Sequence, residues 1–439
     1  MNRIFSTMFF VLVLGVAAPA VLARDWYVSA ARGKGRTGTA EQPAGDLGNV
    51  ISRLADGDRV FIAEGVYTGR GDNGRDFIDK PVEIYGGFAD DFSKRDPWGA
   101  HRTVLTGVLK TENWEQGYRL AVDLSKRRDI RGPHKVVIDG IIVDNGPRNR
   151  YAGEDAKIIR TANPATGENP TPGYGGISVA VTKFGDIIIR NCVVLNTASL
   201  GGGAIEAWGS EKSNVLVTNN IACNNTGYGF YLRSAFHPNE TERMPRHTFT
   251  HNTSVFNSKP DPGATHGGSA LRVDAPTRVA AEWNVLALSD YYGVNNSSQA
   301  KQFTLNNNLF VSNLRADYLE FDTQMNVDEL EDEADKLDEA GGNIASDKLR
   351  PKVSREWAAK YLSRQVVDRA AKEAEVKAVQ SGVNELRSIL GFPLQGTSVG
   401  EYSDAWLPRI PLDDALVCGG AAVLGKYGSG NPGVSEPVR

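Results

Sequence analysis

Cysteine is scarce in this chain, and the cysteines present do not form a regular set. The 439 residues contain three, at Cys192, Cys223 and Cys418. An odd number at such wide spacing excludes a small domain held together by a disulfide framework. In the repeat register described below, Cys192 and Cys223 both point inward about 8 Å apart, which is too far for an unstrained bridge. We therefore expect buried free thiols, and Cys418 can pair with either one only if the C-terminal tail folds back.

Strong net charge and long apolar segments are missing as well. The formal net charge is −4 and the pI is about 6.0, a balance that gives no reason to expect nucleic acid as a partner. The apolar run from Met8 to Val16 follows Arg3 and precedes small residues that end at Ala23, which is the pattern of a secretory signal. The run is too short to span a membrane well. We expect removal of residues 1–23, no transmembrane segment after cleavage, and a protein that is secreted, periplasmic or at the cell surface.

A pattern that returns five times between Gly175 and Asn313 organises the chain. Each pass has three short apolar strands, an Asn before the third strand, and a polar residue five positions after that Asn. Equivalent positions are 24 to 32 residues apart, so the unit is constant while the loops vary in length, as in a solenoid. The five pairs are Asn191/Asn196, Asn220/Asn225, Asn252/Asn257, Asn284/Ser289 and Asn308/Asn313.

Three short strands per repeat predict an all-β fold, a right-handed single-stranded parallel β-helix. Segments such as 187–189 and 215–217 are apolar and mostly β-branched, and a period this short leaves no room for two helices. Coils would stack at about 4.8 Å, which brings equivalent Asn side chains into a hydrogen-bonded ladder. We expect this domain over residues 24–320. A short N-terminal helical cap at 47–54, starting from Asp46, would cover its open end.

Two stretches near the N-terminus carry a family resemblance. Residues 56–67 read DGDRVFIAEGVY, and residues 80–88 read KPVEIYGGF. Both resemble the opening segment of secreted right-handed β-helix proteins of the pectate-lyase-like superfamily, in which a Gly-Asp strand opens the first coil and a Gly-Gly-Phe turn follows the second. The resemblance covers about residues 25–145 directly. It implies the fold but leaves the activity open, because the superfamily holds lyases, hydrolases, epimerases and non-catalytic adhesins.

An earlier coil and a long loop lie between this segment and the clean repeats. In residues 136–144, Asp139 takes the ladder position and Asp144 the position five residues later. Residues 147–174 are rich in Pro, Gly, Asn and Thr, and they carry four basic side chains. We expect them to leave the stack and to border a binding surface.

The composition changes after Asn313. Residues 328–339 are acidic, and residues 353–390 have apolar side chains at helical spacing. We interpret residues 321–390 as an acidic and helical C-terminal cap against the flank or the end of the solenoid. Residues 391–439 are rich in Pro and Gly and predict an irregular tail that wraps back on the body.

Strand alternation predicts which side chains face outward after each glycine corner. The inward members are Ile177/Val179, Ile205/Ala207, Phe230/Leu232 and Leu271/Val273. The outward members form a first column of Ser178, Glu206, Tyr231 and Arg272, and a second column of Ala180, Trp208, Arg233 and Asp274. Large polar and aromatic side chains would thus lie about 4.8 Å apart on neighbouring coils.

These columns suit the chemistry of an acidic polysaccharide. Trp208 and Tyr231 can stack on sugar faces, and arginines can bind sugar carboxylates in bidentate fashion. A lyase or epimerase removes the proton beside that carboxylate, which requires a cation on the developing enolate and a nearby base. The predicted catalytic residues are Arg233 or Arg272 as the cation and Tyr231, His237 or His266 as the base.

The remaining predicted site residues bind substrate or metal. Glu206, Trp208 and Lys183 form the predicted substrate-binding set. Glu206 and Asp274 could ligate Ca²⁺, although two carboxylates are few for a tight site.

Three functions remain open on the sequence. The first is an exported, monomeric lyase or epimerase that acts on a uronate-containing glycan by proton abstraction and β-elimination. The second is a non-catalytic cell-envelope or adhesin-like protein that binds glycan, in which the charged side chains are ordinary surface ion pairs. The third is an inverting glycoside hydrolase, for which Glu206 and Asp274 lie about 10 Å apart on strand geometry.

Overall fold

The computed structural model of the protein describes residues 23–419 apart from several loops and parts of the C-terminal region. The undescribed segments within that span are 35–36, 70–73, 108–116, 149–150, 153–156, 160–174, 236–240, 259–265, 275, 298–301, 347–351, 363–383, 385–386, 389–390 and 395–405. Residues 1–22 of the predicted secretory signal and most of the predicted helical segment at 353–390 therefore lie outside the described residues.

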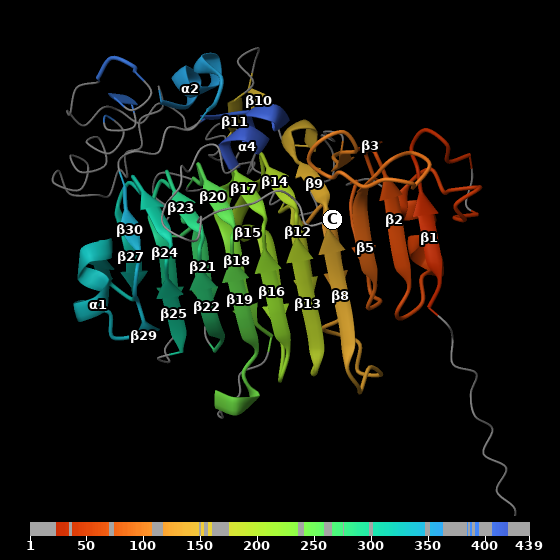
Figure 1. The fold of residues 1–439 in the computed structure, drawn as a ribbon, viewed down its shortest axis with the longest axis horizontal. Helices are drawn as coiled ribbons and strands as arrows, with labels where there is room; N and C mark the ends of the chain where they lie inside the picture. The colour runs from red at the N-terminus through yellow and green to blue at the C-terminus, as the bar shows by residue number, and fades with distance from the viewer. Residues whose placement is uncertain are drawn as a thin grey trace, which may run out of the picture.

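Three long sheets, which we call A, B and C, form the walls of a right-handed parallel β-helix, and their strands lie side by side along the molecule (Figure 1). Within the described residues, sheet A has ten strands and sheets B and C have nine each. Nearly all pairings are parallel, and each coil runs from sheet C to A to B. This confirms the predicted fold.

The strand bounds show how short each rung is. Sheet A contains β1 (Asp25–Val28), β2 (Arg59–Ala63), β5 (Glu83–Phe88), β8 (His134–Asp139), β13 (Gly185–Arg190), β16 (Asn214–Thr218), β19 (Arg246–Thr250), β22 (Arg278–Glu282), β25 (Phe303–Asn306) and β29 (Leu337–Glu339). Sheet B contains β3 (Gly65–Tyr67), β6 (Thr103–Leu105), β9 (Ile141–Asp144), β14 (Val193–Leu195), β17 (Ile221–Cys223), β20 (Thr253–Val255), β23 (Val285–Ala287), β26 (Leu309–Val311) and β30 (Ile344–Ala345). Sheet C contains β4 (Asp76–Ile78), β7 (Leu120–Asp123), β12 (Ile177–Ala180), β15 (Ala198–Gly209), β18 (Thr226–Ser234), β21 (Leu271–Asp274), β24 (Tyr292–Ser297), β27 (Ala316–Glu320) and the antiparallel β28 (Thr323–Met325).

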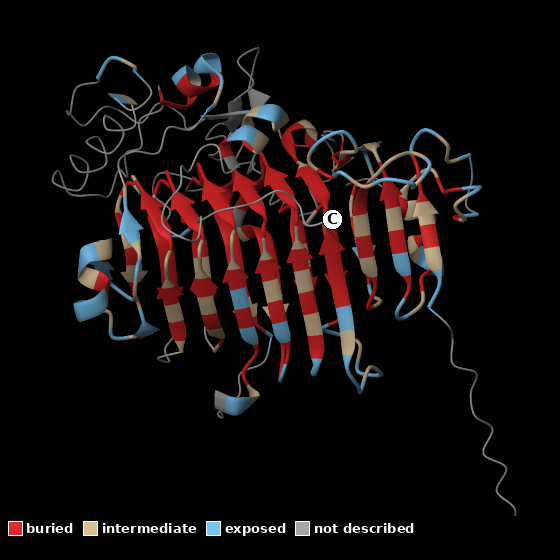
Figure 2. Cartoon of the chain, viewed as in Figure 1, coloured by how far each residue is buried: buried red, intermediate tan, exposed pale blue. Residues whose placement is uncertain are grey.

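The core is a continuous stack of inward-facing apolar side chains. Bands of buried residues run across neighbouring strands in Figure 2. One such row in sheet C is Ile177, Ile205, Phe230, Leu271 and Val294, all at most 1% exposed. Because every coil buries one such row, stability grows with the number of stacked coils.

An asparagine ladder lines the corner between sheets A and B. Asn220 donates its amide to Asn252 at 3.0 Å, Asn252 to Asn284 at 3.1 Å, Asn284 to Asn308 at 2.9 Å, and Asn308 to Asn343 at 3.1 Å. The same acceptor oxygens also receive backbone N–H groups. The ladder thus provides hydrogen-bond acceptors for buried backbone N–H groups at the corner, which would otherwise be unpaired.

The first pass of the predicted repeat is wrong by one residue. The ladder position there is Cys192, whose backbone N–H donates to Asn220 at 2.9 Å, while Asn191 pairs with Asn219 at 2.8 Å. Asn191 and Asn219 have φ of 53° and 55°, a left-handed conformation that Asn tolerates better than most residues. Two adjacent corner positions therefore both favour Asn, and spacing alone did not separate them.

The positions five residues later shift in the same way. The Thr197 N–H donates to Asn225 at 3.1 Å, so Thr197 and not Asn196 takes this place. Asn196 instead accepts from Asn224 at 2.9 Å. Its own amide donates to Asp144, so Asp144 also lies outside the ladder.

Asp139 is not a ladder residue either. It ends β8, accepts from Asn191 at 2.8 Å, and pairs with Arg95 at 2.5 Å and Arg190 at 2.7 Å on the outer side of sheet A. Gly140, with φ of 72°, takes the left-handed corner in this coil. Through its ion pair with Arg95, Asp139 thus links sheet A to the loop at residues 89–98.

The N-terminal cap is made of two 3₁₀ turns, η1 (Leu47–Asn49) and η2 (Ile51–Arg53). Asp46 accepts the Gly48 N–H at 2.9 Å, as the predicted cap requires. Leu47, Val50 and Leu54 are buried against the first coil and cover its core.

The C-terminal end of the solenoid lies beyond the predicted boundary at 320. Strands β29 and β30 continue sheets A and B to Ala345, and Asn343 continues the ladder. The acidic run at 328–339 closes this end with η5 (Val327–Glu329) and the short helix α1 (Leu330–Glu333), where Leu330 enters the core. Two further 3₁₀ turns, η3 (Gly146–Arg148) and η4 (Thr241–Arg243), lie in loops.

The C-terminal region packs on the outer face of sheet B. It includes α2 (Arg355–Leu362), β31 (Trp406–Pro408) and α4 (Leu412–Gly419), and β31 joins β10 (Tyr151–Ala152) and β11 (Lys157–Ile159) in a small antiparallel sheet. Residues of this region bury a second apolar cluster on sheet B, which includes Trp357, Tyr361, Ile410 and Cys418. The described residues 406–419 of the predicted tail pack on the body, and α4 is helical where an irregular chain was expected.

The inward orientation predicted for Cys223 is wrong. Cys192 belongs to the main core, whereas Cys223 lies on the outer side of β17, in the second cluster. Sheet B is apolar on both faces, so its strands lack the alternation that marks inside and outside.

A buried histidine predicts acid sensitivity. His247 takes an inward place on sheet A between Val215 and Val279, and burial lowers its pKa to about 4. The unfolded value is about 6.5, so stability is complete above pH 6.5 and is lost as pH falls through 4, by roughly 3 kcal/mol in total. We expect His247→Leu to remove this loss, measured as the thermal midpoint against pH. His134→Gln, at a half-exposed position on the same sheet, should retain the wild-type slope, and an unchanged slope in His247→Leu would contradict the assignment.

Candidate functional site

The two predicted outward columns are present on sheet C. Ser178, Glu206, Tyr231 and Arg272 are in direct register on β12, β15, β18 and β21. Trp208 and Arg233 are in register in the second column, and Asp274 follows on β21 two residues after Arg272. Residues that are 25 and 41 positions apart in the chain are thereby brought together, because each coil returns to the same wall.

Glu206 is the most buried member of this group. It is 3% exposed, and it accepts hydrogen bonds from Arg233 at 3.1 Å, from the Tyr118 hydroxyl and from the Trp208 side chain. Burial raises the pKa of Glu206 to about 7, although Arg233 partly offsets this rise. Around neutral pH this carboxyl therefore exists in both protonation states, as a general acid or base requires.

Asp274 has the opposite electrostatic balance. Burial raises its pKa, but hydrogen bonds from Ser297 and Tyr231 and the charges of Arg272 and Arg233 outweigh burial and hold the pKa below its ordinary value. Asp274 therefore remains ionised at neutral pH. Two neighbouring carboxyl groups with separated pKa values are a recurrent feature of acid–base sites.

The two arginines connect the columns. Arg233 lies between both carboxyl groups, 3.1 Å from Glu206 and 3.6 Å from Asp274, and its guanidinium is 3.7 Å from the ring centroid of Trp208. Arg272 pairs with Asp274 at 3.0 Å and donates to the Tyr228 hydroxyl at 2.7 Å. When Glu206 is protonated, the two arginines and ionised Asp274 leave one net positive charge in the site, which attracts an anionic ligand.

Three contributors were missed on the sequence. Tyr118 precedes β7, Tyr228 lies early in β18, and Ser297 ends β24. Tyr118 and Ser297 come from rungs outside the aligned set, and simple alternation from Phe230 places Tyr228 inside. With these residues we define the sheet C cluster as Tyr118, Glu206, Trp208, Tyr228, Tyr231, Arg233, Arg272, Asp274 and Ser297.

The other predicted site residues are Lys183, His266 and His237, and the first two have other neighbours among the described residues. Lys183 lies in the turn after β12 and pairs with Glu211 at 2.6 Å. His266 is exposed, with its ring near Gly201, and no bond between it and the cluster is seen among the described residues. His237 lies outside the described residues. The roles predicted for all three remain predictions.

The predicted calcium ligands Glu206 and Asp274 are paired with arginine in this structure, and the calcium requirement remains a prediction. Glu206 and Asp274 both contact the positive charge of Arg233, which occupies the space between them. Within the described residues, no group of three or more His, Cys, Asp or Glu side chains is placed to hold a metal ion. The oxygens of the two carboxyl groups accept hydrogen bonds from arginine, tyrosine and serine side chains, and a hard cation would have to compete with these donors.

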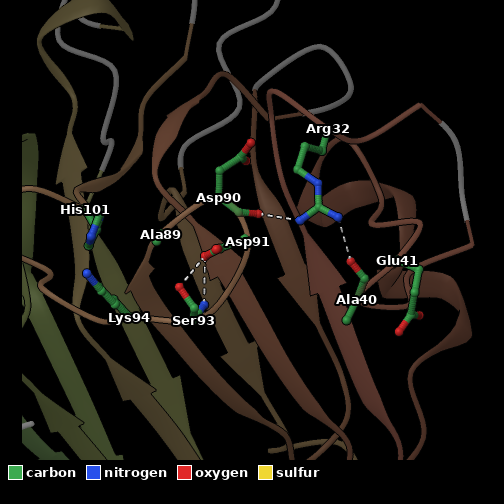
Figure 3. Close-up of a pocket in the computed structure, with 9 residues that line it drawn as sticks. All are labelled: Arg32, Ala40, Glu41, Ala89, Asp90, Asp91, Ser93, Lys94 and His101. Carbon is green, nitrogen blue, oxygen red and sulfur yellow. Dashed lines mark hydrogen bonds between the residues drawn. The ribbon is translucent and has the colours of Figure 1, made fainter.

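A separate hollow lies at the N-terminal end, between the loops after β1 and β5 (Figure 3). Its volume is about 740 Å³, and it is lined by Arg32, Glu41, Asp90, Asp91, Lys94 and His101 among others. Arg32 donates to the carbonyls of Asp90 at 2.8 Å and Ala40 at 3.1 Å, and Asp91 accepts from Ser93. Arg32 therefore connects the two loops, whereas the bond between Ser93 and Asp91 lies within one of them.

Comparison with known proteins adds one likeness. No protein-family model matches the chain, and no curated protein matches it. The chain is similar to a solved structure described as "Crystal structure of pectate lyase Pel9A", with a TM-score of 0.38 and 12% identity over 76% of this chain and 85% of that one. The strand topology itself defines the class, a right-handed parallel β-helix protein. The sheet C cluster lies on one outer wall of this β-helix.

No helix that the structure describes has both the length and the apolar character needed to cross a bilayer.

Proposed function

We propose that this exported protein binds an acidic, uronate-containing polysaccharide across the outer face of sheet C and cleaves it by β-elimination. One observation carries the proposal: on adjacent rungs, two arginines lie beside one carboxyl group with a raised pKa and another with a lowered pKa. Each of these groups supplies one part of the reaction.

The arginines meet the substrate carboxylate. Arg233 and Arg272 can bind it in bidentate fashion and stabilise the negative charge that develops on the enolate. In the absence of substrate they stabilise ionised Asp274 instead. A bound carboxylate competes for both arginines, and Asp274 then becomes a stronger base.

Tyr231 and Asp274 form a proton relay. The Tyr231 hydroxyl donates to Asp274, and burial raises the tyrosine pKa, so an isolated tyrosinate is not favoured. Tyr231 can instead accept the proton from the carbon beside the carboxylate while it passes its own proton to Asp274. The bond from the β carbon to the leaving oxygen breaks, a carbon–carbon double bond forms, and protonated Glu206 gives its proton to that oxygen.

Hydrolysis is the second candidate, and the separation of the two carboxyl pKa values favours it. Glu206 as acid and Asp274 as base are the pair that glycosidic hydrolysis requires. In this reaction Asp274 takes a proton from a water molecule, and not from the substrate carbon.

A product assay on the mature protein separates these functions. The protein is incubated with a panel of uronate polymers, with added Ca²⁺ and with a chelator. Ultraviolet absorbance of new unsaturated ends indicates the lyase, and reducing ends without it indicate the hydrolase. A changed uronate composition without new ends indicates an epimerase. Binding with no product at all would reject an enzymatic role and leave the glycan-binding alternative. Activity that is lost with the chelator would support the predicted calcium requirement.

Arg233→Ala is expected to abolish turnover, because it removes the cation between the two carboxyl groups and the contact with Trp208. Arg190→Ala, which removes an arginine paired with Asp139 on sheet A, is the matched control and should retain activity. Initial rates at saturating polymer and thermal midpoints are measured for both variants. Equal activity in the two would place the site elsewhere.

A further inference from the structure

Two cysteines meet where the C-terminal region covers sheet B. Cys223 ends β17 and points away from the solenoid interior, and Cys418 lies in α4, which packs on β17. Both side chains are fully buried, and the Cys418 side chain is a hydrogen-bonding neighbour of the Cys223 thiol. Residues about two hundred positions apart in sequence thus share one apolar contact.

This contact is held by bonds that do not involve sulfur. The Ile410 N–H donates to Asn196 at 2.9 Å, and the Asn196 amide donates back to the Ile410 carbonyl at 3.0 Å. Asp413 pairs with Arg102 at 2.6 Å. Because these bonds fix the segment that leads into α4, the approach of Cys418 to Cys223 is a property of the fold and not a chance contact of a free tail.

We propose that Cys223 and Cys418 form a disulfide that fastens α4 to the wall of the solenoid. Each thiol loses its proton, the two electrons pass to a thiol–disulfide oxidant such as oxidised glutathione, and one S–S bond forms. The predicted secretory signal directs the chain to an oxidising compartment, where such bonds form and persist. The bond is independent of the proposed catalytic activity.

Burial sets the time at which this bond forms. It raises the pKa of Cys223 well above its ordinary value, and the thiolate is the reactive species in exchange. Exchange in the folded, reduced protein is therefore slow, and the disulfide forms while the chain folds, before α4 closes over the pair. Cys192 faces the main core, on the other side of the wall, and hydrogen-bonds to the carbonyls of Ile138 and Arg190. It serves as the internal control.

The experiment refolds the full mature chain from denaturant in a buffer of reduced and oxidised glutathione. Remaining thiols are then blocked with an alkylating reagent under denaturing conditions, and peptides are mapped by mass spectrometry without reduction. We expect one linked species that joins the peptides of Cys223 and Cys418 and is lighter than their sum by two hydrogen atoms, with Cys192 alkylated. Recovery of Cys223 and Cys418 as thiols from native protein, or a link that includes Cys192, would overturn the proposal.

Thermal unfolding gives a second readout. Oxidised protein should unfold several degrees above the same protein reduced in denaturant and refolded, because a bond across so long a loop restricts the unfolded chain. Cys192→Ser should retain this difference, and Cys418→Ser should lose it. If Cys418→Ser fails to fold, the peptide map of the wild-type chain still decides the question.

Discussion

Glu206→Gln is expected to lower kcat on the preferred uronate polymer by about 10²- to 10⁴-fold, the usual contribution of a positioned general acid. Glutamine keeps the size of the side chain and can still bond to Tyr118 and Arg233, but it cannot give a proton to the leaving oxygen. Glu282→Gln, the same change on the outer face of sheet A, is the matched control and should leave the rate unchanged. Initial rates with saturating polymer measure both variants.

The pH profile tests the same assignment without a change in structure. Glu206 has a pKa of about 7 and acts in its protonated form, so wild-type kcat should fall as pH rises through 7. Glu206→Gln should lack this limb, since no proton is lost from the amide. A variant that keeps the wild-type rate, or keeps the same basic limb, would remove Glu206 from the mechanism.

Glu206 should also lower stability at alkaline pH. Its folded pKa lies above the unfolded value of about 4.3, so its contribution to stability is complete below pH 4.3 and is lost as pH rises through 7. The thermal midpoint of Glu206→Gln relative to wild type should therefore be higher at pH 8 than at pH 4. Functional sites commonly retain residues that lower the stability of the folded protein.

Arg119→Met is expected to lower the free energy of unfolding by about 3–5 kcal/mol, the usual cost of breaking a buried ion pair. Arg119, which precedes β7, pairs with Asp76 of β4 at 2.5 Å, and the two side chains are 0% and 1% exposed. Arg119 also donates to the carbonyls of Tyr67 and Thr106, so its loss leaves a buried carboxylate and unpaired backbone oxygens. Denaturant titration followed by circular dichroism measures the change.

An exposed pair provides the control for this measurement. Arg59 and Asp25 also form a two-bond pair, at 2.7 and 2.9 Å, but their side chains are 49% and 32% exposed. Arg59→Met should therefore cost only about 0–1 kcal/mol. A double replacement of Asp76 by Leu and Arg119 by Met should regain much of the lost stability. If Arg119→Met and Arg59→Met lowered the free energy of unfolding equally, burial would not determine how much these ion pairs contribute to stability.

Much of the candidate site was predictable because one wall of the solenoid obeys simple alternation. Sheet C has a buried inner face and a polar outer face, so Glu206, Tyr231 and Arg272 could be placed in one column from their distance to a glycine corner. The ladder was predictable for the same reason from Asn220 onward. Asn191 was displaced by one residue because the adjacent left-handed position also favours Asn.

Other features carried no readable pattern. Cys223 faces outward because the C-terminal region covers sheet B and makes both of its faces apolar. Tyr118 reaches Glu206 from a coil that precedes the long loop at 147–174, and no repeat spacing connects the two. The end of the solenoid was missed because Leu337–Glu339 lies within an acidic run that resembles the end of a domain, and Ile344–Ala345 follows that run.

By itself the sequence determined the coil, its three walls, and six of the side chains of the sheet C cluster, because these depend on local spacing that every repeat carries. Only the tertiary structure decided the partner and the protonation of each group. Glu206 and Asp274 are both carboxyl groups on one wall. Burial raises the pKa of Glu206 to about 7, whereas two arginines and two hydroxyl groups keep Asp274 ionised. These pKa shifts depend on neighbours from other coils, so the residue type at one position does not predict them.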